Sequence, residues 1–572
     1  MNINKESLNE IEDVDTNNSE NNSNGNLEKK LTTSNEIERE TTDETNQDEN
    51  VGEAIGEAIE DVIIAEKKAF NGWKRFQKRM LEPATFSDVV SSSHKITEVE
   101  YEALQLEDAN TYAQKFLIIK PSKFGRLYDK FTRLAGDTVT FIITCLLILV
   151  WAILGIVYGA PEDWQIIMQD VSSIQSYFSD SLLMRQQQND YMDLLQLLAE
   201  IRSRSSTYLE MFTGYFRSNE IKILNTEELD NVTKEVKEVL GEATEISADN
   251  WFDKMSDVAS KIFGSFYCVL FYWCGIIVWI GCGALPYLEF GNDWQLYINT
   301  ATAVEITFVT MFIQNVRERH NKYLQKSLSL ILYTDHQIEF NLRKVTGYEN
   351  PNSRHVIPAK KLSKGVKAIE YYAHVIGGGL GVAISTLVFI AWICVGHPMD
   401  FSANWWLIIG TYTGLIGFVD GFTLRSSYYR YFNYGFQNFE DIDEFENKLL
   451  NILHLPPIST RQPTWKERSF DYRASSVIGR ILSSSWGVLF ALCVTIMLII
   501  IASAMDWSTT GQLICNTPTM IIEGFCLLVL LEGHNQNNTR LRILAHDCLT
   551  RKMFFKLYTE KLLESKECNN CS

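Results

Sequence analysis

The sequence lacks the signatures of the common enzyme classes. It contains no Gly-x-x-x-x-Gly-Lys-[Ser/Thr] loop, the phosphate-binding motif of many ATP-driven proteins, and it shows no nucleophile–base set. Eight of its eleven cysteines lie in apolar runs, where cysteine acts as a small hydrophobic residue and not as part of a disulfide framework. Cys568 and Cys571 form a C-x-x-C without the second pair of a typical zinc site. We therefore expect neither an enzyme nor a cofactor.

Charge is missing from four long stretches of the chain. These stretches are Thr138–Ala160, Ile262–Leu288, Val375–Pro398 and Ile481–Met505, and each holds more than 20 residues without Asp, Glu, Lys or Arg. A helix rises about 1.5 Å per residue, so about 20 apolar residues cross the hydrocarbon layer of a bilayer. The four stretches therefore predict four membrane helices.

Apolar residues are scarce near the N-terminus, where acidic residues gather. Residues 1–61 contain 18 acidic and 4 basic residues, so they contribute −14 to the net charge of −19 and the other residues only −5. The segment is also rich in Asn, Ser and Thr. Such a composition cannot bury a hydrophobic core, and it predicts a disordered tail over residues 1–65.

Each uncharged stretch is followed by the same pattern of a short turn, an Asp-Trp or Asn-Trp pair, and a more polar helix. The four copies read EDWQIIMQD, NDWQLYINT, ANWWLIIGT and MDWSTTGQL. The second helices are expected to begin at Trp164, Trp294, Trp405 and Trp507, and matching NTPT in the fourth copy to NTAT in the second needs a four-residue insertion. The pattern predicts an all-α polytopic membrane protein with eight transmembrane helices, arranged as four tandem two-helix hairpins in parallel repeat.

Basic residues are absent from the four turns and present at the opposite ends of the hairpins. The positive-inside rule therefore places the turns outside the cell and both termini in the cytosol. The expected segments are a disordered tail over 1–65, cytosolic juxtamembrane helices over 66–136, hairpins over 137–190, 258–319, 372–428 and 479–535, cytosolic loops over 191–257, 320–371 and 429–478, and a cytosolic tail over 536–572.

The second helices carry five carboxylates and no basic residue that could pair with them. They are Asp170, Asp180, Glu305, Asp420 and Glu523. A carboxylate in hydrocarbon costs about 3 kcal/mol or more, so it normally faces protein or water and has a partner. Two explanations remain open. Either burial keeps the acids protonated, or a transported cation is the missing partner.

Neutral polar residues on the same helices favour a cation pathway lined by the second helices. They are Gln169, Asn299, Thr300, Thr411, Asn516 and Thr517. Hydrogen bonding between packed helices would explain these residues, but it explains five carboxylates without bases poorly. Glu305 and Glu523 are expected at similar depth, about 16–20 Å from the turns. His320 and His534, just past the inner ends, could act at an exit or be simple interfacial residues.

Several long motifs resemble a known family. They are IMQDVSSIQSYFSDSLLMRQQ, VWIGCGALP, DWQLYINTATAV, NWWLIIGTYTGLIGFVDGF and DWSTTGQLICNTPTMIIEGFCLLVLL. The chain resembles the fungal low-affinity iron(II) permeases over roughly residues 115–545. The second hairpin is also similar to the small bacterial low-affinity iron permease module, which supports the repeat.

The resemblance implies low-affinity uptake of Fe(2+) across the plasma membrane, with copper, zinc, manganese and cadmium as further cargo. The implied partners are the lipid bilayer and divalent metal ions, with no nucleic acid. The residues that match the shared motifs are Gln169, Asp170, Gln175, Asp180, Asn299, Thr300, Thr411, Asp420, Asn516, Thr517 and Glu523. Glu305 joins the expected metal-binding residues with less support from the family. Two alternatives stay open: a proton-coupled carrier of another solute, and a membrane scaffold or sensor that transports nothing.

Overall fold

The computed structural model describes residues 88–117, 123–217, 224–241, 247–286, 288–458 and 470–571. The chain divides into two compact units, Met1–Phe76 and Gln77–Ser572, and every described residue belongs to the second. The predicted disordered tail over 1–65 therefore lies outside the described residues.

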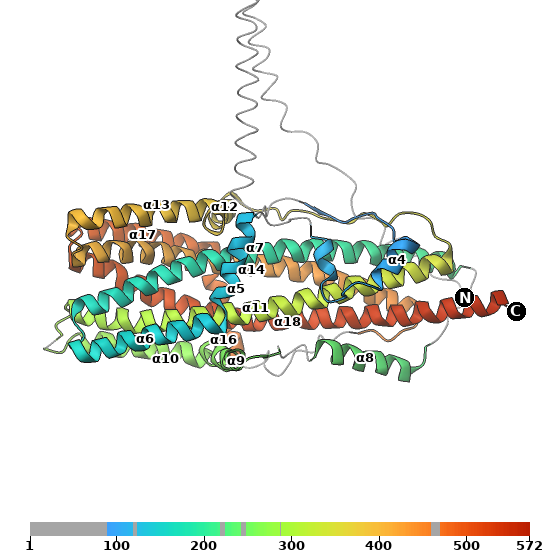
Figure 1. Ribbon diagram of the computed structural model, residues 1–572, viewed down its shortest axis with the longest axis horizontal. Coiled ribbons are helices and arrows are strands. Elements are labelled where there is room, and N and C mark those ends of the chain that lie inside the picture. The colour runs from blue at the N-terminus through green and yellow to red at the C-terminus, as the bar shows by residue number, and fades with distance from the viewer. Residues whose placement is uncertain are drawn as a thin grey trace, which may run out of the picture. The chain divides into compact units, whose positions relative to one another are not determined.

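Four long helices form the centre of the second unit (Figure 1). They are α7 (Glu162–Tyr215), α11 (Asn292–Thr346), α14 (Ala403–Ile452) and α18 (Thr509–Cys571). Each packs mainly against two others, and the order around the resulting square is α7, α11, α18, α14. All four run past the ends that the sequence placed for the hairpins, and α18 continues through Pro518.

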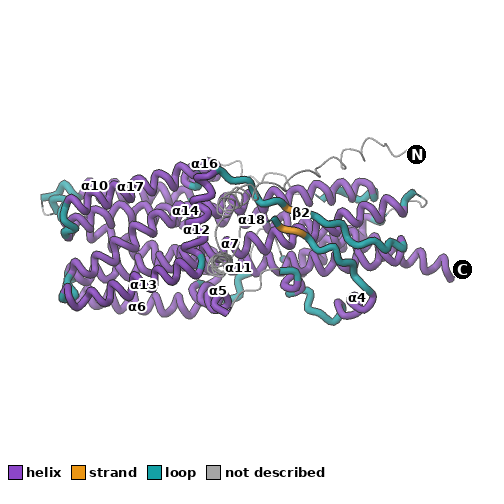
Figure 2. Tube along the Cα trace, turned by 90° about the horizontal axis from the view of Figure 1, so that it is seen from above, coloured by secondary structure: helices purple, strands orange, loops and turns teal. Residues whose placement is uncertain are grey.

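Four shorter apolar helices precede the long ones and lie along one end of the bundle (Figures 1 and 2). They are α6 (Thr138–Tyr158), α10 (Phe266–Cys282), α13 (Gly379–Gly396) and α17 (Ser485–Ala504). Each covers a seam between two long helices. For example, α13 stacks Trp392 on Trp405 of α14 and Phe389 on Phe178 of α7. Their outer faces are apolar and exposed, as at Phe271 of α10, and such a surface suits lipid.

Length and composition would let six of the described helices cross a membrane, or seven if the bent pair α9 (Trp251–Phe263) and α10 counts as one span. The two helices of that pair meet at 66°. Helix α7 is not among the six. Its turn-side half carries Asp170, Asp180 and a series of Ser and Gln residues, which lower its hydropathy.

The four turns between short and long helices share one backbone hydrogen bond. The pairs are Ala160 N–H to the Gly155 carbonyl, Phe290 to Gly283, Phe401 to Gly396 and Trp507 to Ala502, at 2.8, 3.0, 3.0 and 2.9 Å. All four donor residues have positive φ angles. Trp507 therefore lies in the turn and α18 begins at Thr509, two residues later than expected. Four residues beyond each donor stand Trp164, Trp294, Trp405 and Gly511, which agrees with the four-residue insertion.

Tryptophan pairs hold the turn ends of three short helices to their long helices. Trp151 stacks on Trp164, Trp279 on Trp294 and Trp392 on Trp405, with ring centroids 3.8, 3.9 and 4.2 Å apart. In each pair both indole N–H groups donate to the carbonyl of the partner residue. In the fourth copy Gly511 replaces the tryptophan, and the Cys515 thiol contacts the Leu498 carbonyl.

The remaining elements surround this framework. Amphipathic helices α5 (Lys123–Ala135), α9, α12 (Lys364–Gly377) and α16 (Phe470–Leu482) each end shortly before an apolar helix. The others are α4 (Glu98–Leu104), α8 (Thr226–Leu240), the 3-10 helices η1 (Tyr112–Lys115) and η2 (His397–Met399), and strands β1 (Val89–Val90) and β2 (Val356–Ile357). The strands pair antiparallel, with Val89 opposite Ile357. They lie just beyond the middle of the bundle, in the half away from the turns (Figure 2).

Candidate functional site: a polar path along the bundle axis

One face of each long helix is buried along the axis of the square. We count positions from four equivalent reference residues, Trp164, Trp294, Trp405 and Gly511. Positions 2, 5, 9, 12, 16 and 19 are then buried in all four helices. Spacings of three and four residues are those of helices that pack around a common axis. Each position therefore forms a layer with one side chain or glycine from each helix.

Two apolar layers close this series at its ends. The turn-side ring at position 2 consists of Ile166, Leu296, Leu407 and Leu513, which form one buried cluster. The far-side ring at position 19 consists of Leu183, Ile313, Leu424 and Leu530, all buried in a second cluster. The rings are 17 residues apart along each helix, which is about 25 Å. The predicted polar side chains lie between them.

The first polar layer, at position 5, consists of Gln169, Asn299, Gly410 and Asn516, and Asp170 lies beside it at position 6 of α7. Asn299 donates from Nδ2 to Gln169 Oε1 at 3.1 Å. Asp170 lies against Gly410, where an added Cβ would overlap Asp170 Oδ1 and stand 3.6 Å from Asn516 Nδ2. Both carboxylate oxygens of Asp170, which is fully buried, lack a hydrogen-bond partner among the described residues. The layer thus offers carboxylate and amide oxygens to a ligand.

The second polar region gathers three carboxylates from α7, α14 and α18. Ser176 Oγ donates to Glu523 Oε1, and Glu523 faces Gly417, where a Cβ would stand 3.1 Å from Oε2. Asp180 interacts electrostatically with both Glu523 and Asp420, and neither of its oxygens has a hydrogen-bond partner among the described side chains.

Tyr372 donates from its hydroxyl to Asp420 Oδ1 at 2.6 Å, while Asp420 Oδ2 has no hydrogen-bond partner within the described parts of the chain. The structure thus brings three of the five predicted acids into one region and places Asp170 nearer the turns.

Glu305 takes a different direction from the other four acids. It lies at the depth of Glu523, as expected. Gly524 follows Glu523 on α18, and a Cβ added there would be 2.8 Å from Glu305 Oε2. The same Cβ would be 3.1 Å from the hydroxyl of Tyr272 on α10. Glu305 therefore faces the seam between α11, α18 and α10.

The predicted neutral residues are distributed around the first polar layer. Thr517 Oγ1 donates to Gln295 Oε1 at 3.4 Å, and the hydroxyls of Thr300 and Thr411 have no partner among the described residues. Gln175 is half-buried outside the axial series. Sequence reasoning missed Ser176 and the glycine column of α14, although the spacing of Gly410, Gly414, Gly417 and Gly421 is visible in the sequence. Within this column, Gly410 leaves room for Asp170 of α7 and Gly417 for Glu523 of α18.

The polar side chains along the path offer mainly oxygen atoms to a ligand. Carboxylate and amide oxygens suit hard and borderline divalent cations, so the donor set fits a divalent ion that moves between layers. Over the described ranges, no three His, Cys, Asp or Glu side chains form a group that could hold a metal ion.

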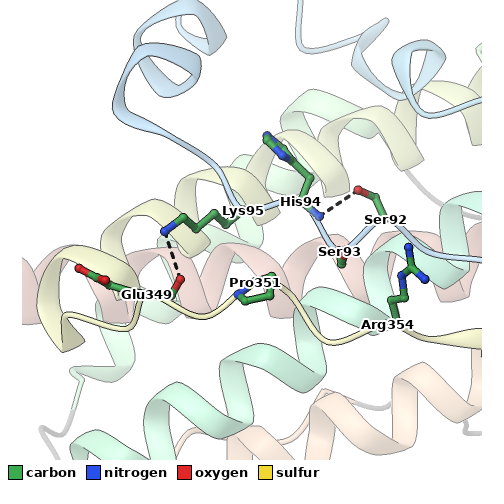
Figure 3. A pocket seen from close by; sticks show the side chains of 7 residues that line it. All are labelled: Ser92, Ser93, His94, Lys95, Glu349, Pro351 and Arg354. Atoms are coloured by element: carbon green, nitrogen blue, oxygen red, sulfur yellow. Dashed lines mark hydrogen bonds between the residues drawn. The ribbon is translucent and has the colours of Figure 1, made fainter.

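A separate surface pocket of about 480 Å³ lies outside this path (Figure 3). It is lined by residues 92–95 and by Glu349, Pro351 and Arg354. Lys95 donates to the Glu349 carbonyl at 3.1 Å. The pocket contains none of the predicted site residues.

A family model described as low affinity iron permease matches residues 124–249, 252–349 and 471–552. The chain belongs to the low-affinity iron permease family. The resemblance read from the motifs is thus confirmed. The matched ranges include all of α7 and α11 and the part of α18 up to residue 552, while α13 and α14 lie outside them.

Two fungal members of this permease family are similar over most of the chain. The low-affinity iron/zinc ion transport protein fet4 of Schizosaccharomyces pombe is 43% identical over 419 residues, which cover 73% of this chain and 70% of the relative. The low-affinity Fe(2+) transport protein of Saccharomyces cerevisiae is 38% identical over 500 residues, which cover 83% and 90%. No solved structure matches the chain.

The contact between Gly410 and Asp170 gives a direct test of the first polar layer. In a Gly410→Ala variant the new methyl group must displace the Asp170 carboxylate, and we expect metal uptake to fall about tenfold or more, because binding groups tolerate little displacement. Alanine favours a helix over glycine by about 1 kcal/mol, so the helix itself should not weaken. Uptake of radioactive iron, normalised to surface protein, is the measurement.

Gly421→Ala is the matched control for this variant. The same methyl group at position 421 meets only the Cys526 side chain, at 3.8 Å, and uptake should stay close to that of the unmodified protein. If the Gly410→Ala and Gly421→Ala variants took up iron equally well, the assignment of Asp170 to the path would be contradicted.

Proposed function

We propose that this permease carries Fe(2+) into the cell with low affinity along the axis of its four long helices. The observation that carries the proposal is the series of buried oxygen atoms without hydrogen-bond partners, contributed by the long helices between two apolar rings. Relatives named as iron, zinc and Fe(2+) transporters support the substrate class. Zinc, copper, manganese and cadmium are further proposed cargo, since oxygen ligands discriminate weakly among divalent ions.

The proposed topology has eight spans in four tandem hairpins, with both termini in the cytosol of a plasma-membrane protein. Three features support it. The turn hydrogen bond recurs four times, each short helix covers the seam beside its own long helix, and basic residues are missing from the turns. In this arrangement the turn-side ring faces the outside and the far-side ring faces the cytosol.

The transport cycle follows from the order of the layers. A hydrated ion that passes the turn-side ring exchanges water for oxygens of Asp170, Gln169, Asn299 and Asn516. It then moves inward to Asp180, Glu523 and Asp420, whose burial without bases is costly unless a cation is present. Passage of the far-side ring releases it. Both rings are closed in this structure, so transport requires each to open, and opening one at a time would prevent leakage.

The decisive experiment is uptake of radioactive Fe(2+) by cells that lack other iron transporters and express this chain. We expect saturable uptake that excess Zn(2+) inhibits. Surface expression without uptake would support the hypothesis of a membrane scaffold or sensor. Transport of another solute, coupled to protons and insensitive to metals, would support the hypothesis of a proton-coupled carrier.

A further inference from the structure

The axis becomes polar again just past the far-side ring. Position 23 holds Gln187, Arg317, Tyr428 and His534. Gln187 is 4% exposed and His534 1% exposed, and none of their side-chain nitrogen and oxygen atoms has a hydrogen-bond partner in the described parts of the chain. Buried polar atoms are normally paired, so these two side chains point to a ligand or to water.

The axis cannot continue as a path beyond this level. Eleven residues past Gln187 and its equivalents, the layer consists of Leu198, Leu328, Phe439 and Ala545, all buried in one apolar cluster. Farther on, Asp335, Glu446 and Lys552 fill the axis as fully buried ion pairs. An ion that has passed the far-side ring must therefore leave sideways between two long helices.

A cavity of about 80 Å³ lies at this level and is lined by all four long helices. Its polar lining includes Gln187 and Asp190 of α7, and Arg317 and Asn321 of α11. The side chain of Asp190 is 29% exposed, so the edge of the cavity between α7 and α11 reaches solvent.

Two contacts close that edge. Arg317 pairs with Asp190 at 3.3 Å, and Asn321 Nδ2 donates to the other Asp190 oxygen at 2.9 Å. Asp129, Asp193 and Glu318 are electrostatic neighbours of Asp190. Arg185 pairs with Asp129 and Lys322 with Glu318, which leaves Asp190 and Asp193 against Arg317. This small excess of negative charge attracts cations.

We propose that this cavity is a metal-release site, in which Gln187 and Asp190 receive the divalent ion and pass it to the cytosol between α7 and α11. The inference rests on the proposed function. The ion replaces Arg317 as the partner of Asp190, and this exchange opens the contact between the two helices. The positive charge of Arg317 remains close by and favours departure of the ion.

The test compares the two faces of the membrane. Purified full-length protein is reconstituted in sealed vesicles, and the KM for Fe(2+) is measured separately for entry from the turn side and from the cytosolic side. Asp190→Asn should raise the cytosolic-side KM about tenfold, the size expected for loss of one charge-assisted contact, and leave the turn-side KM unchanged. Gln187→Leu should act in the same direction.

Glu444→Gln is the matched control, because Glu444 is an acid of α14 whose side chain is 65% exposed and pairs with Lys448. It should change neither KM. Unchanged values on both faces in Asp190→Asn, with active unmodified protein, would overturn the release site alone. Equal changes on both faces would show a structural role and overturn it as well. Unmodified protein without iron transport would instead defeat the proposed function.

Discussion

Glu523→Gln and Asp170→Asn are each expected to lower iron uptake at least 100-fold without removing the protein from the membrane. Both carboxylates are buried between the apolar rings, and no basic residue of the described path compensates them. A divalent ion that loses a carboxylate there loses about 3 kcal/mol or more, which corresponds to a factor of at least about 100. The measurement is radioactive Fe(2+) uptake per surface-exposed molecule.

Glu305→Gln is the informative control for this pair. Glu305 shares the depth of Glu523 but faces Gly524 and Tyr272 in a seam. We therefore expect iron uptake by the Glu305→Gln variant to fall less than about tenfold. If Glu523→Gln and Asp170→Asn both transport iron normally, the axial assignment is wrong. If Glu305→Gln is the most damaging of the three, the path runs along the seam covered by α10.

Lys552→Met is expected to destabilise the protein by about 3–5 kcal/mol, the usual cost of breaking a buried ion pair by removing one partner. Lys552 Nζ contacts Asp335 and Glu446 at 2.7 Å each and Ser205 Oγ at 2.8 Å. These groups come from all four long helices and are fully buried. Opposing charges hold the Lys552 pKa above its usual range, although burial alone would lower it. Thermal unfolding of the purified protein in detergent measures the loss.

Lys556→Met is the matched control for this substitution. Lys556 follows one turn later on α18, its side chain is 27% exposed and it lies 3.9 Å from Glu560. A partly exposed pair of this kind contributes about 0–1 kcal/mol, so the melting temperature of the Lys556→Met variant should stay close to that of the unmodified protein. Equal losses in the two variants would mean that the buried ion pairs do not hold the four helices together.

The sequence alone determined the features that depend on local composition. The uncharged stretches located α6, α10, α13 and α17, and most of the predicted ends lie within a few residues of the ends of these helices. The recurring turn pattern located the polar helices. The acids without bases were also visible, because charge and hydropathy are properties of a residue and its neighbours in the chain. The family could be inferred from the same motifs.

Only the tertiary structure decided which side chains meet. Neighbouring residues on a helix point about 100° apart, so the packing of α11 and α18 decides that Glu523 faces Ser176 while Glu305, at the same depth, faces a seam. Long-range packing also set the order α7, α11, α18, α14. It carried the helices beyond the expected hairpins, because residues past the far-side ring are buried by other long helices and not by lipid. The depth of a residue can be estimated by counting residues along its helix, but the direction of its side chain within the protein depends on the helices that pack against it.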